Sequence, residues 1–141
     1  RLVFPGGAAA MEGGAAQERV EVCMTLQQPD ARMFPGSPFP FEDRLLELFM
    51  CVSHLDSPGQ RLTCFDKKLV VKGAVSLISK RREVLLRAWL PVPGAYAIVP
   101  STWEVELPPG AQEVAFLLSL HLRCAPGRFR LEALAEEGWD A

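Results

Sequence analysis

Apolar and polar residues alternate regularly between positions 84 and 90. Val84, Leu86, Ala88 and Leu90 fall in one phase, whereas the residues between them, at positions 85, 87 and 89, are Leu, Arg and Trp. A strand that is half buried against a core has this period of two. The pattern therefore predicts a strand whose first phase faces the core.

A second alternating run follows after a Pro-Gly pair. Pro93 fixes φ near the value of the second position of a turn, and Gly94 accepts the positive φ that a type II turn needs at its third position. Pro100 cannot donate to a strand ladder and so ends the run. The sequence predicts a β-hairpin whose return strand places residues 95, 97 and 99 on one face and residues 96 and 98 on the other.

Five other segments are candidate strands. Even-numbered residues from 20 to 26 and from 114 to 122 are apolar and predict two more strands. Residues 44–52 fit a helix or a strand by periodicity. Residues 69–71 and 74–78 predict two short runs separated by Lys72 and Gly73, and a turn is expected at residues 57–59.

Length and composition bound the organisation. A chain of 141 residues fits one domain, and 49% hydrophobic with 23% charged residues is typical of a globular protein. We expect a flexible Gly/Ala-rich segment at residues 1–17 and one domain over residues 18–141. The segment from 129 to 139 fits either a final strand or a short helix. A formal net charge of −2 argues against a nucleic-acid partner.

Several short sequence motifs between residues 82 and 118 resemble motifs in domain III of calpain-type cysteine proteases. They are REV at 82–84, PGAY at 93–96, VPSTWE at 99–104 and FLL at 116–118. The resemblance spans roughly residues 18–123 and implies an all-β fold, an antiparallel β-sandwich. The loop after residue 102 is longer and less acidic than in that family. The family's acidic loop before the first matched strand is not found in residues 1–17, so it is absent or lies outside this chain. A partial sandwich and a diverged complete one both remain open. The matched motif residues are Arg82, Glu83, Val84, Pro93, Gly94, Tyr96, Val99, Pro100, Ser101, Thr102, Trp103 and Glu104.

The resemblance also implies a role. In that family the sandwich is a non-catalytic regulatory domain, whose partner is the protease core of the same polypeptide and which conveys calcium or phospholipid signals. The chain is therefore expected to be an interaction domain of a calpain-like cysteine endopeptidase. One alternative is a stand-alone scaffolding or membrane-adaptor protein that retains only the sandwich. The other is a noncanonical or incomplete translation product, which would lack a cooperative fold.

Catalytic chemistry has little support in the sequence. A papain-like or calpain-like protease needs a Cys nucleophile, a His base and usually an Asn to orient the His, and the chain contains no Asn. The four cysteines are widely spaced among apolar residues, which predicts free thiols and a cytoplasmic location. Cys51 with His54 and His121 with Cys124 offer zinc-type ligands, but residues three apart on a strand face opposite sides.

Two sets of charged residues are candidates for binding. Calcium prefers several converging oxygen ligands, and it is the one cofactor for which the loops supply candidate ligands. The candidate ligands are Glu42, Asp43, Asp56, Asp66, Glu104 and Glu106. A basic face for phospholipid or a protein partner would consist of Lys67, Lys68, Lys72, Lys80, Arg81 and Arg82. Ordinary solvated loop acids and strand edges explain the same residues.

Aromatic residues give two further expectations. Trp89 and Trp103 flank the predicted hairpin, and capping of the sandwich core is favoured for them over a ligand platform. Phe34, Phe39 and Phe41 lie in a proline-rich segment that suits docking to a neighbouring domain.

Overall fold

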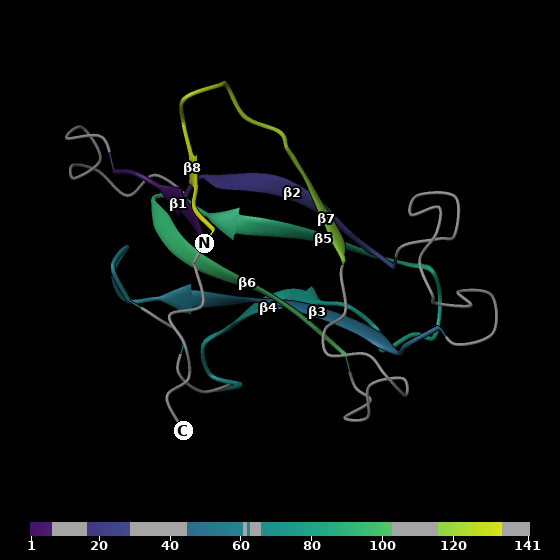
Figure 1. The fold of residues 1–141 in the computed structure, drawn as a ribbon. Coiled ribbons are helices and arrows are strands. Elements are labelled where there is room, and N and C mark those ends of the chain that lie inside the picture. Colours follow the sequence, from purple (N-terminus) through teal and green to yellow (C-terminus); the bar gives the residue numbers. More distant parts are fainter. Residues whose placement is uncertain (7–16, 29–44, 61, 63–65, 103–115, 134–141) are drawn as a thin grey trace.

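The fold is a β-sandwich of two antiparallel sheets (Figure 1). A computed structural model describes residues 1–6, 17–28, 45–60, 62, 66–102 and 116–133. A five-stranded sheet has the order β4-β3-β6-β1-β8, and a three-stranded sheet has the order β5-β2-β7. The predicted all-β sandwich is confirmed, and the described residues contain no helix. The strands are β1 (Leu2–Phe4), β2 (Arg19–Gln27), β3 (Leu48–Leu55), β4 (Val70–Val75), β5 (Glu83–Pro91), β6 (Gly94–Thr102), β7 (Leu117–Leu122) and β8 (Arg130–Leu131).

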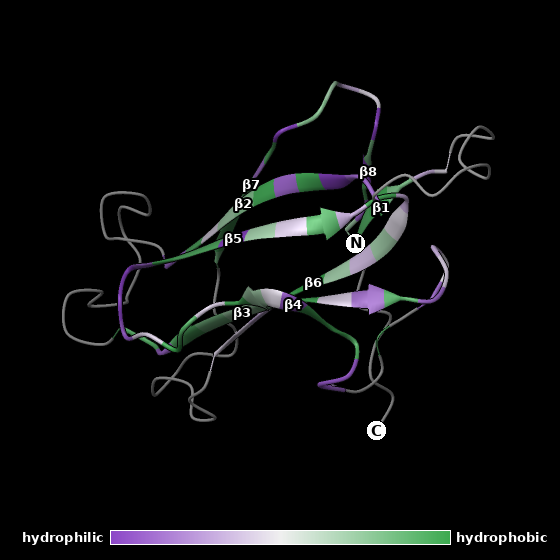
Figure 2. Cartoon of the chain, turned by 180° about the vertical axis from the view of Figure 1, so that it is seen from behind, coloured by the Kyte–Doolittle hydropathy of each residue, from purple (hydrophilic) through white to green (hydrophobic). Residues whose placement is uncertain are grey.

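The core lies between the sheets and follows the predicted strand phases. In β2 and β5 every inward side chain is buried, with exposures between 0% and 6%. Figure 2 shows the result on β2 as alternating hydrophobic and hydrophilic bands. The even-numbered residues of β7 also face the core, although they are only half buried. The inward residues of β2 and β5 are Val20, Val22, Met24, Leu26, Val84, Leu86, Ala88 and Leu90.

Strands β3 and β4 resolve two uncertain segments. Residues 48–55 form a strand and not a helix, with Leu48, Met50 and Val52 in the core. The two short runs predicted around Lys72 are instead one strand, so the predicted break is wrong. Gly73 lies within it at a φ of 78°, and the pairing with β3 shifts register there. A residue that tolerates positive φ lets the strand absorb extra residues as a bulge without ending.

The start of the chain is more ordered than predicted. Residues 2–4 of the segment expected to be flexible form β1, which pairs with β6 and β8, and all three side chains are buried. Residues 7–16 lie outside the described part of the chain. At the other end, the strand alternative is confirmed for residues 130–131, and residues 134–141 are not described.

The predicted hairpin between residues 84 and 99 is wrong, because β5 and β6 belong to different sheets. Gly94 does not have the positive φ of a type II turn, and the Val92–Pro93 peptide bond is cis. Pro91 and Pro93 cannot donate to a ladder, and the amide of Val92 donates to the carbonyl of Glu18 at 2.9 Å, next to β2. The chain therefore stays with β2 through residue 92 and then crosses to the other sheet.

A buried tyrosine closes this crossing. The Tyr96 hydroxyl donates a hydrogen bond to the carbonyl of Pro91, five residues back. The ring lies against Gly94, where a Cβ atom would come within 2.7 Å of the Tyr96 oxygen. It also meets Phe4 edge to face at a centroid distance of 6.3 Å. This arrangement resembles the tyrosine corner of immunoglobulin-like sandwiches, in which a Tyr hydroxyl fixes a sheet-to-sheet connection. We call residues 91–96 the Tyr96 corner.

A buried glutamine joins the sheets at the other end. The Gln28 side chain accepts a hydrogen bond from the amide of Leu46 at 2.9 Å and donates to the carbonyls of Leu46 and Arg81 at 2.8 and 2.9 Å. These bonds connect the end of β2 with the entries to β3 and β5. A buried amide of this kind is stable because its polar atoms are satisfied.

The expected end of β6 at Pro100 is also wrong, since the strand continues to Thr102. Met50 lies opposite Pro100 on β3, and both of its backbone groups bond to Ser76 on the β4 side. The amide of Met50 donates to the Ser76 hydroxyl, and its carbonyl accepts from the Ser76 amide, each at 2.8 Å. Pro100 therefore occupies a position of β6 that forms no backbone hydrogen bond with β3. Its missing donor faces the other edge of β6, beyond the residues that pair with β1.

Replacing Gly94 with Ala should test the close contact in the Tyr96 corner. The added Cβ would lie within 2.9 Å of two ring carbons and the hydroxyl oxygen of Tyr96, so the ring must move. We expect the free energy of unfolding to fall by about 1–3 kcal/mol, as for other overpacked sites. Gly59→Ala is the control, because its Cβ would meet nothing within 4 Å. Equal stability of the two variants in urea denaturation would contradict this packing.

The single tyrosine of the chain should titrate late. Burial raises the pKa of Tyr96 to about 12, because the apolar surroundings disfavour the phenolate. The unfolded chain loses this proton near pH 10, so the contribution of Tyr96 to stability is complete below about pH 10 and is lost as the pH rises toward 12. Tyrosinate absorbance should show the late titration in the folded protein and an ordinary one in urea. The same midpoint in both states would contradict the buried corner.

Candidate interaction face

The outward side of the three-stranded sheet is a continuous face to which all three strands contribute. Paired residues form cross-strand rows, such as Arg87, Cys23 and His121, and next to them Leu85, Thr25 and Ser119. We call this surface the outer face. It consists of Glu21, Cys23, Thr25, Gln27, Glu83, Leu85, Arg87, Trp89, Leu117, Ser119, His121 and Arg123.

Large apolar side chains are exposed on the outer face. Leu85 is 59% exposed, Trp89 is 50% exposed and Leu117 is 45% exposed. The expectation that Trp89 caps the core is therefore wrong, because Trp89 belongs to the outward phase of β5, together with Leu85 and Arg87. Trp103 is not among the described residues. An exposed Trp flanked by aliphatic and charged residues has the composition of an interface centre.

Ion pairs order the polar part of the same face. Glu21, on the central strand, pairs with Arg87 on one side and with Arg123 on the other, the latter at 3.5 Å. The Gln27 side chain donates to the carboxylate of Glu83. These cross-strand contacts fix the charged and polar side chains of the outer face. Trp89 and Leu85 are its exposed apolar side chains and take no part in these contacts.

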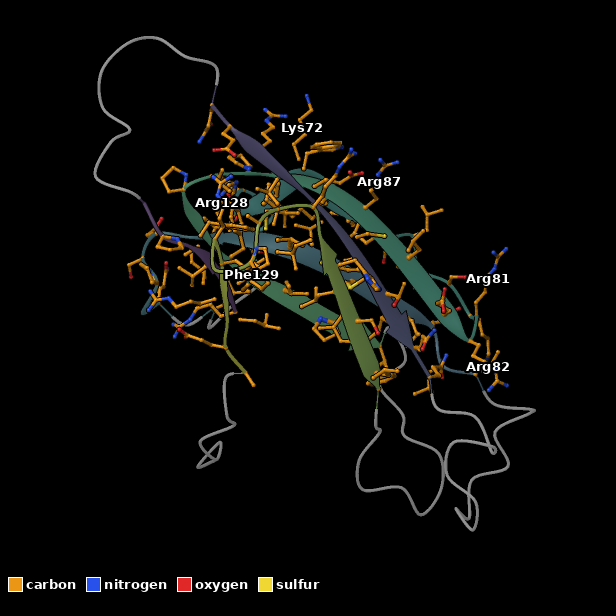
Figure 3. The ribbon with its side chains drawn as sticks, turned by 90° about the horizontal axis from the view of Figure 1, so that it is seen from above. Lys72, Arg81, Arg82, Arg87, Arg128 and Phe129 are labelled. Carbon is orange, nitrogen blue, oxygen red and sulfur yellow. The ribbon has the colours of Figure 1, made fainter. Side chains whose placement is uncertain are left out.

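The six predicted basic residues all lie along β4 and at its two ends. Lys67 and Lys68 precede β4, Lys72 lies within it, and residues 80–82 connect it to β5. All six are exposed. Figure 3 shows Arg81, Arg82, Arg87 and Lys72 following the β5 side of the three-stranded sheet, with Arg128 and Phe129 toward the opposite side. Of the predicted set, Arg81 and Arg82 lie in the connection that leads into β5, Lys72 lies on β4 of the other sheet, and Lys67 and Lys68 lie at the far end of β4.

Of the six acids predicted to bind calcium, Asp56 and Asp66 are described. Asp56 follows β3 and Asp66 precedes β4, so both lie at one end of this strand pair. Asp66 already accepts a hydrogen bond from the amide of Lys68 at 2.8 Å, and two lysines follow it directly. Glu42, Asp43, Glu104 and Glu106 lie outside the described residues. Within the described ranges no group of three or more His, Cys, Asp or Glu residues could hold a metal ion.

The described residues of the family motifs have structural roles in the strands and in the Tyr96 corner. Val84 is buried in β5, and the carbonyl of Arg82 accepts a hydrogen bond from the amide of Gln28 at 2.8 Å. Pro93, Gly94 and Tyr96 form the Tyr96 corner. Residues 99–102 complete β6, and Glu83 begins β5 beside Gln27. Trp103 and Glu104 are not described. The described motif residues therefore form the start of β5, the Tyr96 corner and the end of β6, and they are not grouped as a reactive site.

Thiol chemistry finds no support in the described part of the chain. Cys23, Cys51 and Cys124 are free, and Cys64 is not described. Cys51 is fully buried, and burial raises the pKa of its thiol, so the reactive thiolate is disfavoured. Cys51 and His54 lie on the five-stranded sheet whereas His121 lies on the other, which does not suit the zinc arrangement.

Comparisons with known proteins add no relative, because no family model, no curated protein and no solved structure matches the chain. Among the described residues, no helix has the length and apolar character needed to span a membrane.

Sequence reasoning missed two residues that matter here. Trp89 could have been placed outside, because Arg87 marks its phase of β5 as the solvent side. Gln28 gave no usable signal, since the partners of its side chain lie 18 and 53 residues away in the sequence.

Proposed function

We propose that this chain is a non-catalytic regulatory domain of a calpain-like cysteine endopeptidase, and that it docks its outer face against the protease core of the same polypeptide. The observation that carries the proposal is the half-exposed Trp89, which shares an ordered sheet face with Arg87 and Leu85. The sequence motifs at residues 82–84, 93–96 and 99–104 resemble those of the family and support its assignment in this proposal. The three described cysteines are free thiols, which accords with a cytoplasmic location.

Docking would act by biasing the position of the two catalytic halves. Burial of Trp89 and Leu85 provides the apolar contact, and the basic side chains along β5 select an acidic partner surface. The ion pairs around Glu21 hold the polar rows in place, so little side-chain freedom is lost on docking. A rigid sandwich can transmit this contact because the Tyr96 corner and Gln28 fix both of its ends.

Adding the chain to an isolated calpain-type protease core should change hydrolysis of a fluorogenic peptide. We expect kcat/KM to change by about fivefold or more, the usual scale of coupling between sites. Trp89→Ala should weaken docking, so the concentration of the chain that gives half of the maximal effect should rise about 30-fold, as for a central interface Trp. Leu131→Ala is the matched control, since Leu131 is 54% exposed but lies on β8 of the other sheet. An unchanged rate, or equal effects of the two variants, would contradict the proposal.

A membrane-adaptor role is the second candidate, favoured by the position of Trp89 beside basic residues. The chain should then co-sediment with phosphatidylserine vesicles and not with phosphatidylcholine vesicles. Lys72→Gln and Arg81→Gln should each weaken binding by about fivefold, corresponding to about 1 kcal/mol per charge near an anionic surface. The control is Arg130→Gln, since Arg130 is exposed on β8, away from this side. Equal binding to both kinds of vesicle would count against a membrane role.

A further inference from the structure

One edge of the three-stranded sheet has no neighbour within the described part of the chain. β5 lies beside β4 of the other sheet, and β2 is central. β7 pairs only with β2, and Figure 3 shows it as the outermost strand of this sheet. An unpaired strand edge offers a row of backbone donors and acceptors to another strand.

The core is also less covered along this edge. Inward residues of β2 and β5 are at most 6% exposed, but Leu118, Leu120 and Leu122 of β7 are only half buried. The cause is the unequal size of the sheets, because three strands pack against five. One more strand beside β7 would cover these leucines.

The backbone groups at this edge belong to the same three residues. The amide of Arg123 donates to the carbonyl of Glu21 on β2 at 2.9 Å, so odd-numbered residues of this strand direct their backbone groups toward β2. In an antiparallel ladder these directions alternate. Leu118, Leu120 and Leu122 therefore present their amides and carbonyls to the open edge.

We propose that β7 pairs antiparallel with β7 of a second copy of this chain, joining two three-stranded sheets into one six-stranded sheet. Two-fold pairing with Leu120 opposite Leu120 places Leu118 opposite Leu122, so all three edge residues form ladder hydrogen bonds. Their side chains meet on the inward face. This isologous contact has the commonest symmetry of protein oligomers.

The outward residues fit the same register. Ser119 lies opposite His121 of the second copy, and Leu117 lies opposite Arg123, so no two like charges are directly opposed. A shift of one residue in each strand would place His121 opposite His121 and leave one edge leucine without a leucine partner. Self-complementarity of side chains and backbone together therefore favours a second copy as the occupant.

Sedimentation equilibrium over the micromolar range should give a mass twice the 15.5 kDa of one chain. Ser119→Lys introduces a charge at the edge and should weaken the dimer about tenfold or more. Thr25→Lys is the matched control, because Thr25 is the neighbour of Ser119 on β2 but lies one strand away from the second copy. Its dimer should persist. A monomer at every concentration, or equal loss in both variants while circular dichroism shows both folded, would overturn the proposal.

Cysteine cross-linking tests the register. Leu120→Cys places two thiols opposite each other at a Cα separation of about 5.5 Å, which suits a disulfide. Mild oxidation should give a covalent dimer well above the wild-type background, whereas Leu122→Cys should not, because Leu122 faces Leu118. Equal cross-linking of the two variants would exclude this register. Dimer formation does not require a protease core, so its failure and that of the proposed function are separately visible.

Discussion

The hydrogen bond from the Tyr96 hydroxyl to the Pro91 carbonyl is the contact on which the architecture depends. It holds the chain at the point where it leaves the three-stranded sheet and enters the other one. Because of this crossing, β5 pairs with β2, whereas β6 lies between β3 and β1. A hairpin at the same place would have put both strands in one sheet and removed the two-layer core. Tyr96 therefore couples a local turn to the global topology.

The division of strands into five and three has consequences for function. The smaller sheet is held at one end by the Tyr96 corner and at the other by Gln28. Between these ends it presents an outward face with Trp89 and an open edge at β7. Both proposed contacts use this sheet: docking uses its face and self-pairing uses its edge. Because the two surfaces are adjacent, a dimer would place two outer faces on the same side of one continuous sheet.

Local patterns predicted those features that depend on local physics. The phases of β2, β5 and β7 followed from alternation alone, because one side of each strand packs on the core. The hairpin prediction failed because turn preferences describe the backbone of residues 92–94 and do not include a side-chain bond to Pro91 or the pairing of Val92 with Glu18. β1 was missed because three apolar residues beside a Gly/Ala-rich segment carry little signal. Lys72 and Gly73 were predicted to separate two strands. The sequence does not reveal that Gly73 adopts a positive φ within one strand, because this bulge depends on the pairing with β3.

The candidate site was less predictable than the fold. The composition of the outer face was implicit in strand phase, but its extent depends on which strands pair. The acids proposed for calcium are spread over loops, and only Asp56 and Asp66 fall within the described residues. The basic residues were identified individually, yet their division between the two ends of β4 requires the topology.

Backbone nuclear Overhauser effects across the strands test the central claim most directly. The account predicts contacts between Leu90 and Val20 and between Tyr96 and His54, which are paired in the two different sheets. A contact between the backbones of Leu90 and Ala97, as in a hairpin closed at Pro93 and Gly94, would contradict the crossing and the sandwich built on it.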